Sequence, residues 1–215
     1  IVIEPWGSNS LRVRASKLAE MPQENWALLV PQAECEPVIE IYPDGAFIWN
    51  VKICAKINLI GKITFCNSKG DVLLEEYVRN RKDMYGDTCS SLELEAREFK
   101  PILGGDYRLT MRFISAPKEK IYGMGQYQQP FLDLKGADLE LAHRNSQASV
   151  PFMLSSLGYG FLWNNPAVGR VNFGKNITTW EAFSTKKLDY WITAGDTPAE
   201  IEEAYADATG KVPMM

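Results

Sequence analysis

Short runs in which apolar and polar residues alternate at every second position recur along the chain, and they constrain its fold more than any other feature. The clearest are residues 11–15, 92–95 and 107–113. A period of two gives a strand one buried face and one solvated face. These runs therefore predict half-buried antiparallel strands.

Turn residues between such runs predict two hairpins. Residues 62–65 and 72–74 flank a loop that contains Gly70, and residues 150–155 and 160–163 are joined through Gly158. Glycine supplies the positive φ that a tight hairpin loop needs. Each pair of runs is therefore expected to fold back on itself.

One segment departs from the β pattern. Thr197 and Pro198 suit the N-cap and the first helical position, and Glu200 suits a capping box. The apolar residues that follow have the spacing of one helix face, and Gly210 stands at the C-terminal cap position: Ile201, Ala204, Tyr205 and Ala208. The pattern predicts a helix over 198–209.

About a dozen strand candidates and one late helix favour an all-β fold, a two-sheet antiparallel β-sandwich with one C-terminal helix. We expect residues 1–196 to form the sandwich and residues 197–215 to form the helix and the start of a linker. The chain opens on Ile1 and closes on apolar residues, so it is expected to be part of a longer protein.

Charge and hydropathy exclude two classes of partner. Lysine and arginine total 23 against 27 aspartates and glutamates, for a net charge of −4, and no dense basic run occurs. No nucleic-acid partner is therefore expected. No apolar stretch approaches the roughly 18 residues that cross a bilayer, so no membrane partner is expected either.

The cysteines give no metal-binding pattern. Four are widely spaced without a CxxC pair, and the chain has one histidine to complete a zinc site. Cys54 and Cys66 lie in apolar runs, which favours reduced, buried thiols in a cytoplasmic protein. The alternative is a disulfide in an exported protein, but the sequence has no secretory leader pattern that would support it.

No catalytic constellation follows from spacing. His143 has no nucleophile-elbow motif to serve, and the two glycines of residues 122–126 lack the rest of a phosphate-binding loop. Asp133 and Asp138 could meet as a glycosidase carboxylate pair or be ordinary solvated side chains. The aromatic residues of the last hundred positions could form a sugar platform, although most are expected in the core.

The order of several segments resembles the N-terminal domain of family 31 glycoside hydrolases. The segments are IYGMGQ at 121–126, VPF at 150–152, GYGFLWNNP at 158–166, LDYWI at 188–192, the helix start at 195–201, and Tyr205 with TGKVP at 209–213. The match covers residues 122–215. Residues 1–120 agree in strand pattern alone.

The resemblance implies a galactose-mutarotase-like sandwich placed ahead of a (β/α)₈ barrel in a retaining α-glucosidase or α-xylosidase. Both catalytic aspartates of that family come from the barrel, so no catalytic residue is assigned here and the chain alone is expected to be inactive. No metal or other cofactor is implied. The expected partners are the chain's own catalytic barrel and an oligo- or disaccharide substrate.

The resemblance also implies that one sandwich loop helps to line the sugar pocket. Residues 132–149 occupy that place and are expected to be irregular and exposed. Arg144 and Asn145 stand where the family often has an Arg-Asp pair, so they are the expected substrate-binding residues. Removal of the barrel should also uncover apolar side chains at one face: Tyr205, Val212, Met214 and Met215.

Two other functions fit the fold. A free-standing carbohydrate-binding module would share the sandwich but lack a barrel. A mutarotase is disfavoured, because that family's acid–base chemistry uses two histidines with a glutamate and this chain has one histidine.

Overall fold

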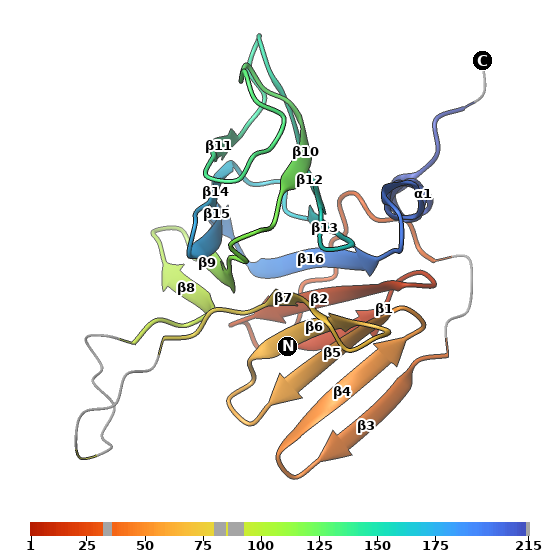
Figure 1. Ribbon diagram of the computed structural model, residues 1–215. Helices are drawn as coiled ribbons and strands as arrows, with labels where there is room; N and C mark the ends of the chain where they lie inside the picture. The colour runs from red at the N-terminus through yellow and green to blue at the C-terminus, as the bar shows by residue number, and fades with distance from the viewer. Residues whose placement is uncertain (32–35, 80–84, 86–92, 214–215) are drawn as a thin grey trace.

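The computed structural model describes residues 1–31, 36–79, 85 and 93–213, and it is an all-β antiparallel sandwich with one C-terminal helix, as predicted (Figure 1). The strands form three antiparallel sheets, which we call sheets I, II and III. Two of them make the expected sandwich, and the third is an addition to it.

Sheet I has six strands in the order β1-β2-β16-β13-β12-β10. Their bounds are β1 Val2–Pro5, β2 Ser10–Ser16, β10 Ile121–Gln126, β12 Ala148–Ser155, β13 Tyr159–Trp163 and β16 Lys187–Ala194. The predicted strand at 11–15 is β2, and the predicted hairpin around Gly158 is β12–β13, with Gly158 at φ 88°. The two most distant parts of the sequence therefore meet where β2 pairs with β16.

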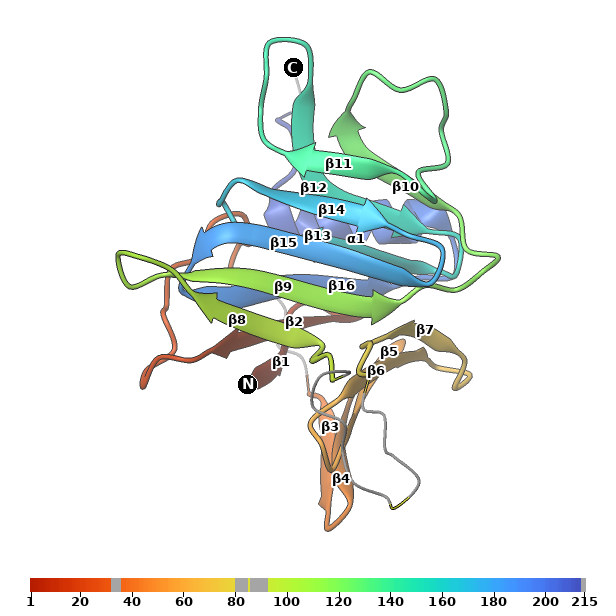
Figure 2. The ribbon, with the colours of Figure 1, turned by 90° about the vertical axis from the view of Figure 1, so that its left-hand side faces the viewer.

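Sheet II has five strands in the order β11-β14-β15-β9-β8 and covers one face of sheet I (Figure 2). Their bounds are β8 Arg97–Pro101, β9 Tyr107–Ile114, β11 Asp138–Leu141, β14 Gly169–Phe173 and β15 Ile177–Thr185. Aromatic rings fill the space between the sheets. The Phe161 ring centroid lies 5.5 Å from that of Phe113, 5.1 Å from that of Trp180 and 5.0 Å from that of Tyr190. Most of the late aromatic residues thus belong to the core, whereas Phe131 and Phe183 are exposed.

Sheet III is a meander of β3 Val38–Tyr42, β4 Gly45–Asn50, β5 Ile53–Asn58, β6 Ile63–Asn67 and β7 Val72–Glu75. The hairpin predicted around Gly70 is β6–β7. The sheet joins the sandwich at its β5–β7 side, where the Phe65 ring lies 6.2 Å from Tyr190 and Glu76 bridges to Phe113. The β3–β4 hairpin projects away from the body (Figures 1 and 2).

Helix α1 (Pro198–Thr209) begins and ends where predicted and packs on the outer face of sheet I. Thr197 caps it by accepting the Glu200 N–H, while the Glu200 carboxylate accepts the N–H of Asp196 instead of the N-cap residue's own. Ile201 is buried beneath the helix, and Tyr205 stacks on Phe152 with ring centroids 4.0 Å apart. Among the described residues, no helix is long and apolar enough to span a membrane.

The helix explains why β13 and β16 have no solvent-exposed face. Sheet II covers one side of these strands, and α1 with residues 17–31 covers the other, so every residue of both strands is buried. A strand buried on both faces becomes a continuous apolar run. The charged exceptions in β16 are Lys187 and Asp189, which are held by a buried network with Arg12.

Some predictions fall partly outside the described residues. Cys54 and Cys66 are free and buried as predicted, and they face each other across β5 and β6. Cys35 and Cys89 lie outside the described residues. The strand predicted at 92–95 begins outside them, and in its described part Leu94 forms an isolated bridge with Arg79.

Candidate functional site

The segment between β10 and β12 is more ordered than the sequence suggested. We expected residues 132–149 to be irregular and exposed, but Asp138–Leu141 forms strand β11, paired with β14. Leu134, Ala137, Leu139 and Leu141 are buried. A four-residue alternation is too short to stand out in the sequence, yet it suffices to extend sheet II by one strand. Irregular backbone remains at residues 132–137, where Leu132 is exposed, and at the exposed tip around residues 143–147.

Arg144 and Asn145 lie at that tip. Reciprocal backbone hydrogen bonds of 3.3 and 3.2 Å between Arg144 and Gln147 close a tight turn, and exposed Asn145 is inside it. The Arg144 guanidinium donates to both carboxylate oxygens of Glu140 at 2.8 and 2.7 Å. Two-point contact fixes the plane of the guanidinium while 61% of the side chain stays exposed. Three of its five N–H donors remain available.

A hollow of about 270 Å³ lies beside Arg144. Its lining comes from the ends of β10 and β11 and from the turn: Tyr127, Gln128, Gln129, Asp138, Leu139, Glu140, Arg144 and Gln147. The Tyr127 hydroxyl is within 2.8 Å of both the Glu140 carbonyl and Ser149 Oγ, and burial raises the pKa of Tyr127. These bonds fix the wall between β10 and β11.

Gln129 adds an unused acceptor to the hollow. Its Oε1 atom is buried and has no hydrogen-bond partner among the described residues. A buried amide oxygen without a partner costs about 1–3 kcal/mol, so such an atom is typical of a place where a ligand donates. No sequence signal marks Gln129, because an isolated glutamine in a loop matches no motif.

The other candidates from the sequence have structural partners. Asp133 accepts the backbone N–H groups of Ile121 and Lys135, whereas Asp138 binds the guanidinium of Arg170. The carboxylate pair is therefore not formed. His143 Nδ1 accepts the Ser149 N–H at 3.3 Å and so helps to close the tip.

The two glycines of residues 122–126 form a bulge in β10. Gly123 and Gly125 have φ of 96° and 89°, and the pairing with β12 shifts register between them. A Cβ on Gly125 would lie 2.3 Å from the Ala148 carbonyl oxygen. The backbone geometry itself therefore requires these glycines.

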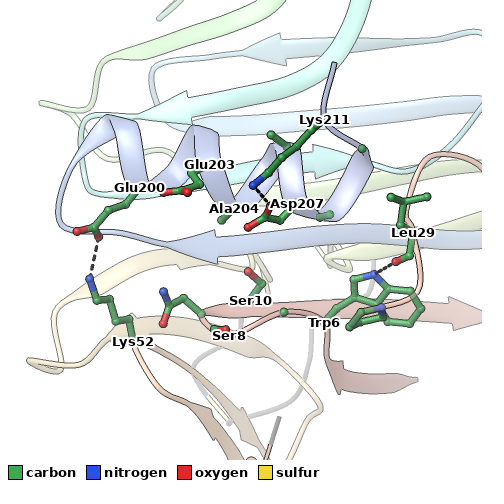
Figure 3. A pocket seen from close by; sticks show the side chains of 16 residues that line it. Trp6, Ser8, Ser10, Leu29, Lys52, Glu200, Glu203, Ala204, Asp207 and Lys211 are labelled. Carbon is green, nitrogen blue, oxygen red and sulfur yellow. Dashed lines mark hydrogen bonds and ion pairs between the residues drawn. The ribbon is translucent and has the colours of Figure 1, made fainter. Parts of the chain in front are cut away.

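A larger cleft of about 640 Å³ lies elsewhere, between α1 and residues 6–10 (Figure 3). Lys52 spans its mouth with ion pairs to Asp196 and Glu200 at 2.6 and 2.7 Å, and hydrogen bonds from these two carboxylates raise the pKa of Lys52. Trp6 lies at the other end, where its indole N–H donates to the Leu29 carbonyl. Lys52 and Trp6 thus already have partners within the chain, and we assign no binding role to this cleft.

The predicted uncovered face is partly wrong. Tyr205 is half-buried against Phe152 within its own chain. Val212 is exposed at 88% of its surface, as expected. Met214 and Met215 lie outside the described residues.

Comparison with curated proteins places the chain beside family 31 enzymes, although no protein-family model matches it. It is 51% identical to the uncharacterized family 31 glucosidase ORF2 of Pseudescherichia vulneris over 98% of this chain and 41% of that protein. It is 34% identical to alpha-xylosidase A of Aspergillus niger over 51% of this chain and 15% of that protein. The chain thus spans less than half the length of these relatives.

Solved structures of family 31 enzymes also resemble the chain. A GH31 alpha-xylosidase from a soil metagenome, crystallised with xylose, superposes with a TM-score of 0.93 at 55% identity, over 99% of this chain and 32% of that one. The xylosidase from Aspergillus niger superposes with a TM-score of 0.79 at 23% identity, over 98% of this chain and 31% of that one, which supports the fold alone.

Proposed function

The chain belongs to glycoside hydrolase family 31, and we propose that it is the non-catalytic β-sandwich domain of a retaining α-glycosidase. One observation supports this above all: the 51% identity extends over nearly the whole chain but over 41% of the relative. The two catalytic carboxylates and the covalent glycosyl-enzyme intermediate then belong to a barrel outside this chain. The sandwich would support that barrel.

The proposed substrate is an α-xyloside. The A. niger relative is named an alpha-xylosidase, and so is the soil-metagenome enzyme at 55% identity, which was crystallised with xylose. An α-glucoside is the second candidate, because the relative from P. vulneris is named a glucosidase. In the full-length enzyme that contains this domain, the ratio of kcat/KM for nitrophenyl α-xyloside to that for nitrophenyl α-glucoside decides between the two substrates.

The proposed contribution of the domain to the sugar pocket is the tip of the β11–β12 loop. Glu140 already orients the Arg144 guanidinium, so its free N–H groups can donate to a sugar hydroxyl without further ordering. Asn145 offers an exposed amide donor and acceptor within the same turn. Gln129 Oε1 can accept a hydroxyl proton in the adjoining hollow.

The position of this tip suits a contact with a neighbouring domain. In both ribbon views the loop and the residues that follow α1 lie at the same end of the molecule (Figures 1 and 2). We propose that residues 1–196 form one sandwich domain, with sheet III attached to it, and that residues 197–215 lead through α1 toward the barrel. The docking of Ile201 and Tyr205 on sheet I would fix the direction of that connection.

Activity of the purified chain tests the proposal. The 215-residue chain should not hydrolyse nitrophenyl α-xyloside or α-glucoside, whereas an enzyme that joins it to a family 31 barrel should hydrolyse one of them. Turnover by the chain alone, lost on substitution of one of its own carboxylates, would contradict a non-catalytic role. A free-standing carbohydrate-binding module would instead bind a sugar tightly without any barrel, with a dissociation constant well below the millimolar range.

We propose a cytoplasmic location on the basis of the cysteines. Cys54 and Cys66 are direct neighbours across β5 and β6, and both are free thiols. Facing thiols that stay reduced are typical of a reducing compartment.

A further inference from the structure

Strand β3 is the edge strand of sheet III, and its apolar side chains are exposed on both faces. Ile39 and Ile41 are 59% and 81% exposed on one face, and Val38 and Tyr42 are 54% and 47% exposed on the other. The strand pairs with β4 on one side and with no described strand on the other. Soluble proteins normally protect such an edge with charge or with a covering element.

The two faces of β3 continue different surfaces of sheet III. Ile39 is opposite Ile48, which is 4% exposed, so Ile39 and Ile41 continue the face of sheet III that packs on the sandwich. That apolar face extends beyond the elements that cover it. On the other face the Tyr42 ring lies 5.8 Å from the Phe47 ring. The exposed edge is thus a continuation of a built core.

The position of the β3–β4 hairpin indicates which molecule can pair with the free edge of β3. The β3–β4 hairpin projects from the end of the molecule opposite to the Arg144 tip and to the residues that follow α1 (Figures 1 and 2). A domain that follows α1 would lie at the end of the molecule that holds the Arg144 tip, away from the hairpin. The hairpin therefore stays accessible to a second molecule.

We propose that β3 pairs antiparallel with β3 of a second copy of this chain, which extends sheet III across a two-fold axis. A self-complementary edge suits an isologous contact. An axis at Ile41 places Ile41 opposite its copy and Glu40 opposite Tyr42. The Tyr42 hydroxyl already donates to the Glu40 carboxylate within the strand, so this pair is chemically compatible. An axis at Glu40 would oppose two carboxylates, which is unfavourable.

Flanking residues set the extent of the contact. Pro37 and Pro43 stand immediately outside β3, and proline has no N–H to donate to a neighbouring strand. With the axis at Ile41, Ile39 lies opposite Pro43 of the second copy, so the pairing is centred on residues 40–42. The contact is therefore short, with apolar side chains above and below a few backbone hydrogen bonds.

Sedimentation velocity of the 215-residue chain between about 1 and 200 µM tests the proposal. The chain should form dimers as concentration rises, and Ile41→Lys should weaken dimerisation at least tenfold. Leu103→Lys is the matched control, since Leu103 is fully exposed in the β8–β9 turn and should leave the dimer unchanged. Hydrogen exchange should show β3 amides protected at high concentration only.

Two results would overturn the proposal. One is a chain that remains monomeric over the whole range. The other is a dimer that both lysine variants weaken equally, or that forms without added protection of β3, because the association would then use another surface.

Discussion

Arg12 and Asp189 form a fully buried two-point ion pair between β2 and β16. The guanidinium Nε and Nη2 atoms lie 2.9 and 2.6 Å from the two carboxylate oxygens, and the side chains are 3% and 0% exposed. Lys187 Nζ lies 3.5 Å from the same carboxylate and donates to the carbonyls of Pro22 and Glu24. Lys187 therefore joins the ion pair to the segment that crosses the outer face of sheet I.

Asp189→Ala should lower the free energy of unfolding by about 3–5 kcal/mol, because it leaves the Arg12 charge buried without its partner. Urea unfolding measures the effect. Asp207→Ala is the control, since its ion pair with Lys211 is exposed to solvent and should contribute little to stability. The double variant Arg12→Met/Asp189→Leu should be more stable than Asp189→Ala, and a double variant that is no better would contradict this explanation.

Stability should fall as pH rises through a window set by Glu76. Its side chain is fully buried, and burial raises its pKa from 4.5 to about 7, although Arg97 and the Ile63 N–H both donate to it. Because the folded pKa is the higher one, this contribution is fully present below about pH 4.5 and is lost as pH approaches 7. The loss amounts to at most about 3 kcal/mol.

Glu76→Gln should remove this dependence. In unfolding curves of both proteins, the original chain should lose stability relative to the variant between pH 4.5 and about pH 7, and from there to pH 8 the difference should become constant. Parallel pH profiles would show that Glu76 keeps an ordinary pKa beside Arg97.

Val51→Asn should stabilise the chain by about 1 kcal/mol. Val51 lies in the β4–β5 turn at φ 53°, which a β-branched residue adopts at a cost and asparagine adopts readily, and its side chain is 62% exposed. Val72→Asn is the control, because Val72 is 52% exposed in β7 without a positive φ and should lose stability instead. Equal effects on the midpoint of urea unfolding would argue against backbone strain at Val51.

The sequence was informative where structure is set by neighbouring residues. Thr197, Pro198 and Gly210 delimit α1 through local capping chemistry, so the predicted helix and the observed helix coincide. Gly70 and Gly158 likewise mark hairpins that the structure contains. Alternation identified which residues of a strand are buried but gave no information on which sheet buries them. Sheet III was therefore not anticipated.

The candidate site could be predicted only in part, because its geometry depends on contacts between residues far apart in the sequence. The family resemblance points to Arg144 and Asn145, but the ion pair that orients Arg144 depends on β11, which places Glu140 beside the turn. That strand is four residues long and is fixed by its pairing with β14, a contact between residues far apart in the sequence. Gln129 became visible only when folding buried its amide oxygen.

Gln129→Leu should lower kcat/KM about tenfold in the family 31 enzyme that contains this domain, because a sugar hydroxyl would lose its acceptor. The thermal midpoint should be unchanged or higher, since the substitution removes a buried polar atom that has no partner in the free chain. Gln126→Leu is the control, because Gln126 is exposed at the end of β10 and does not line the hollow. A lower thermal midpoint with unchanged kcat/KM would assign Gln129 to the fold and not to the substrate.

The role of the β11–β12 tip is tested most directly by kcat/KM of Arg144→Ala and Asn145→Ala in that same enzyme, with the thermal midpoint recorded for each variant. Loss of a hydrogen bond to a bound sugar should reduce kcat/KM roughly ten- to a hundredfold in either variant while the midpoint stays constant. Arg108→Ala, which removes a comparable exposed ion pair with Glu181 on sheet II, should leave kcat/KM unchanged. Unchanged kcat/KM in both tip variants would contradict a contact between this domain and the substrate.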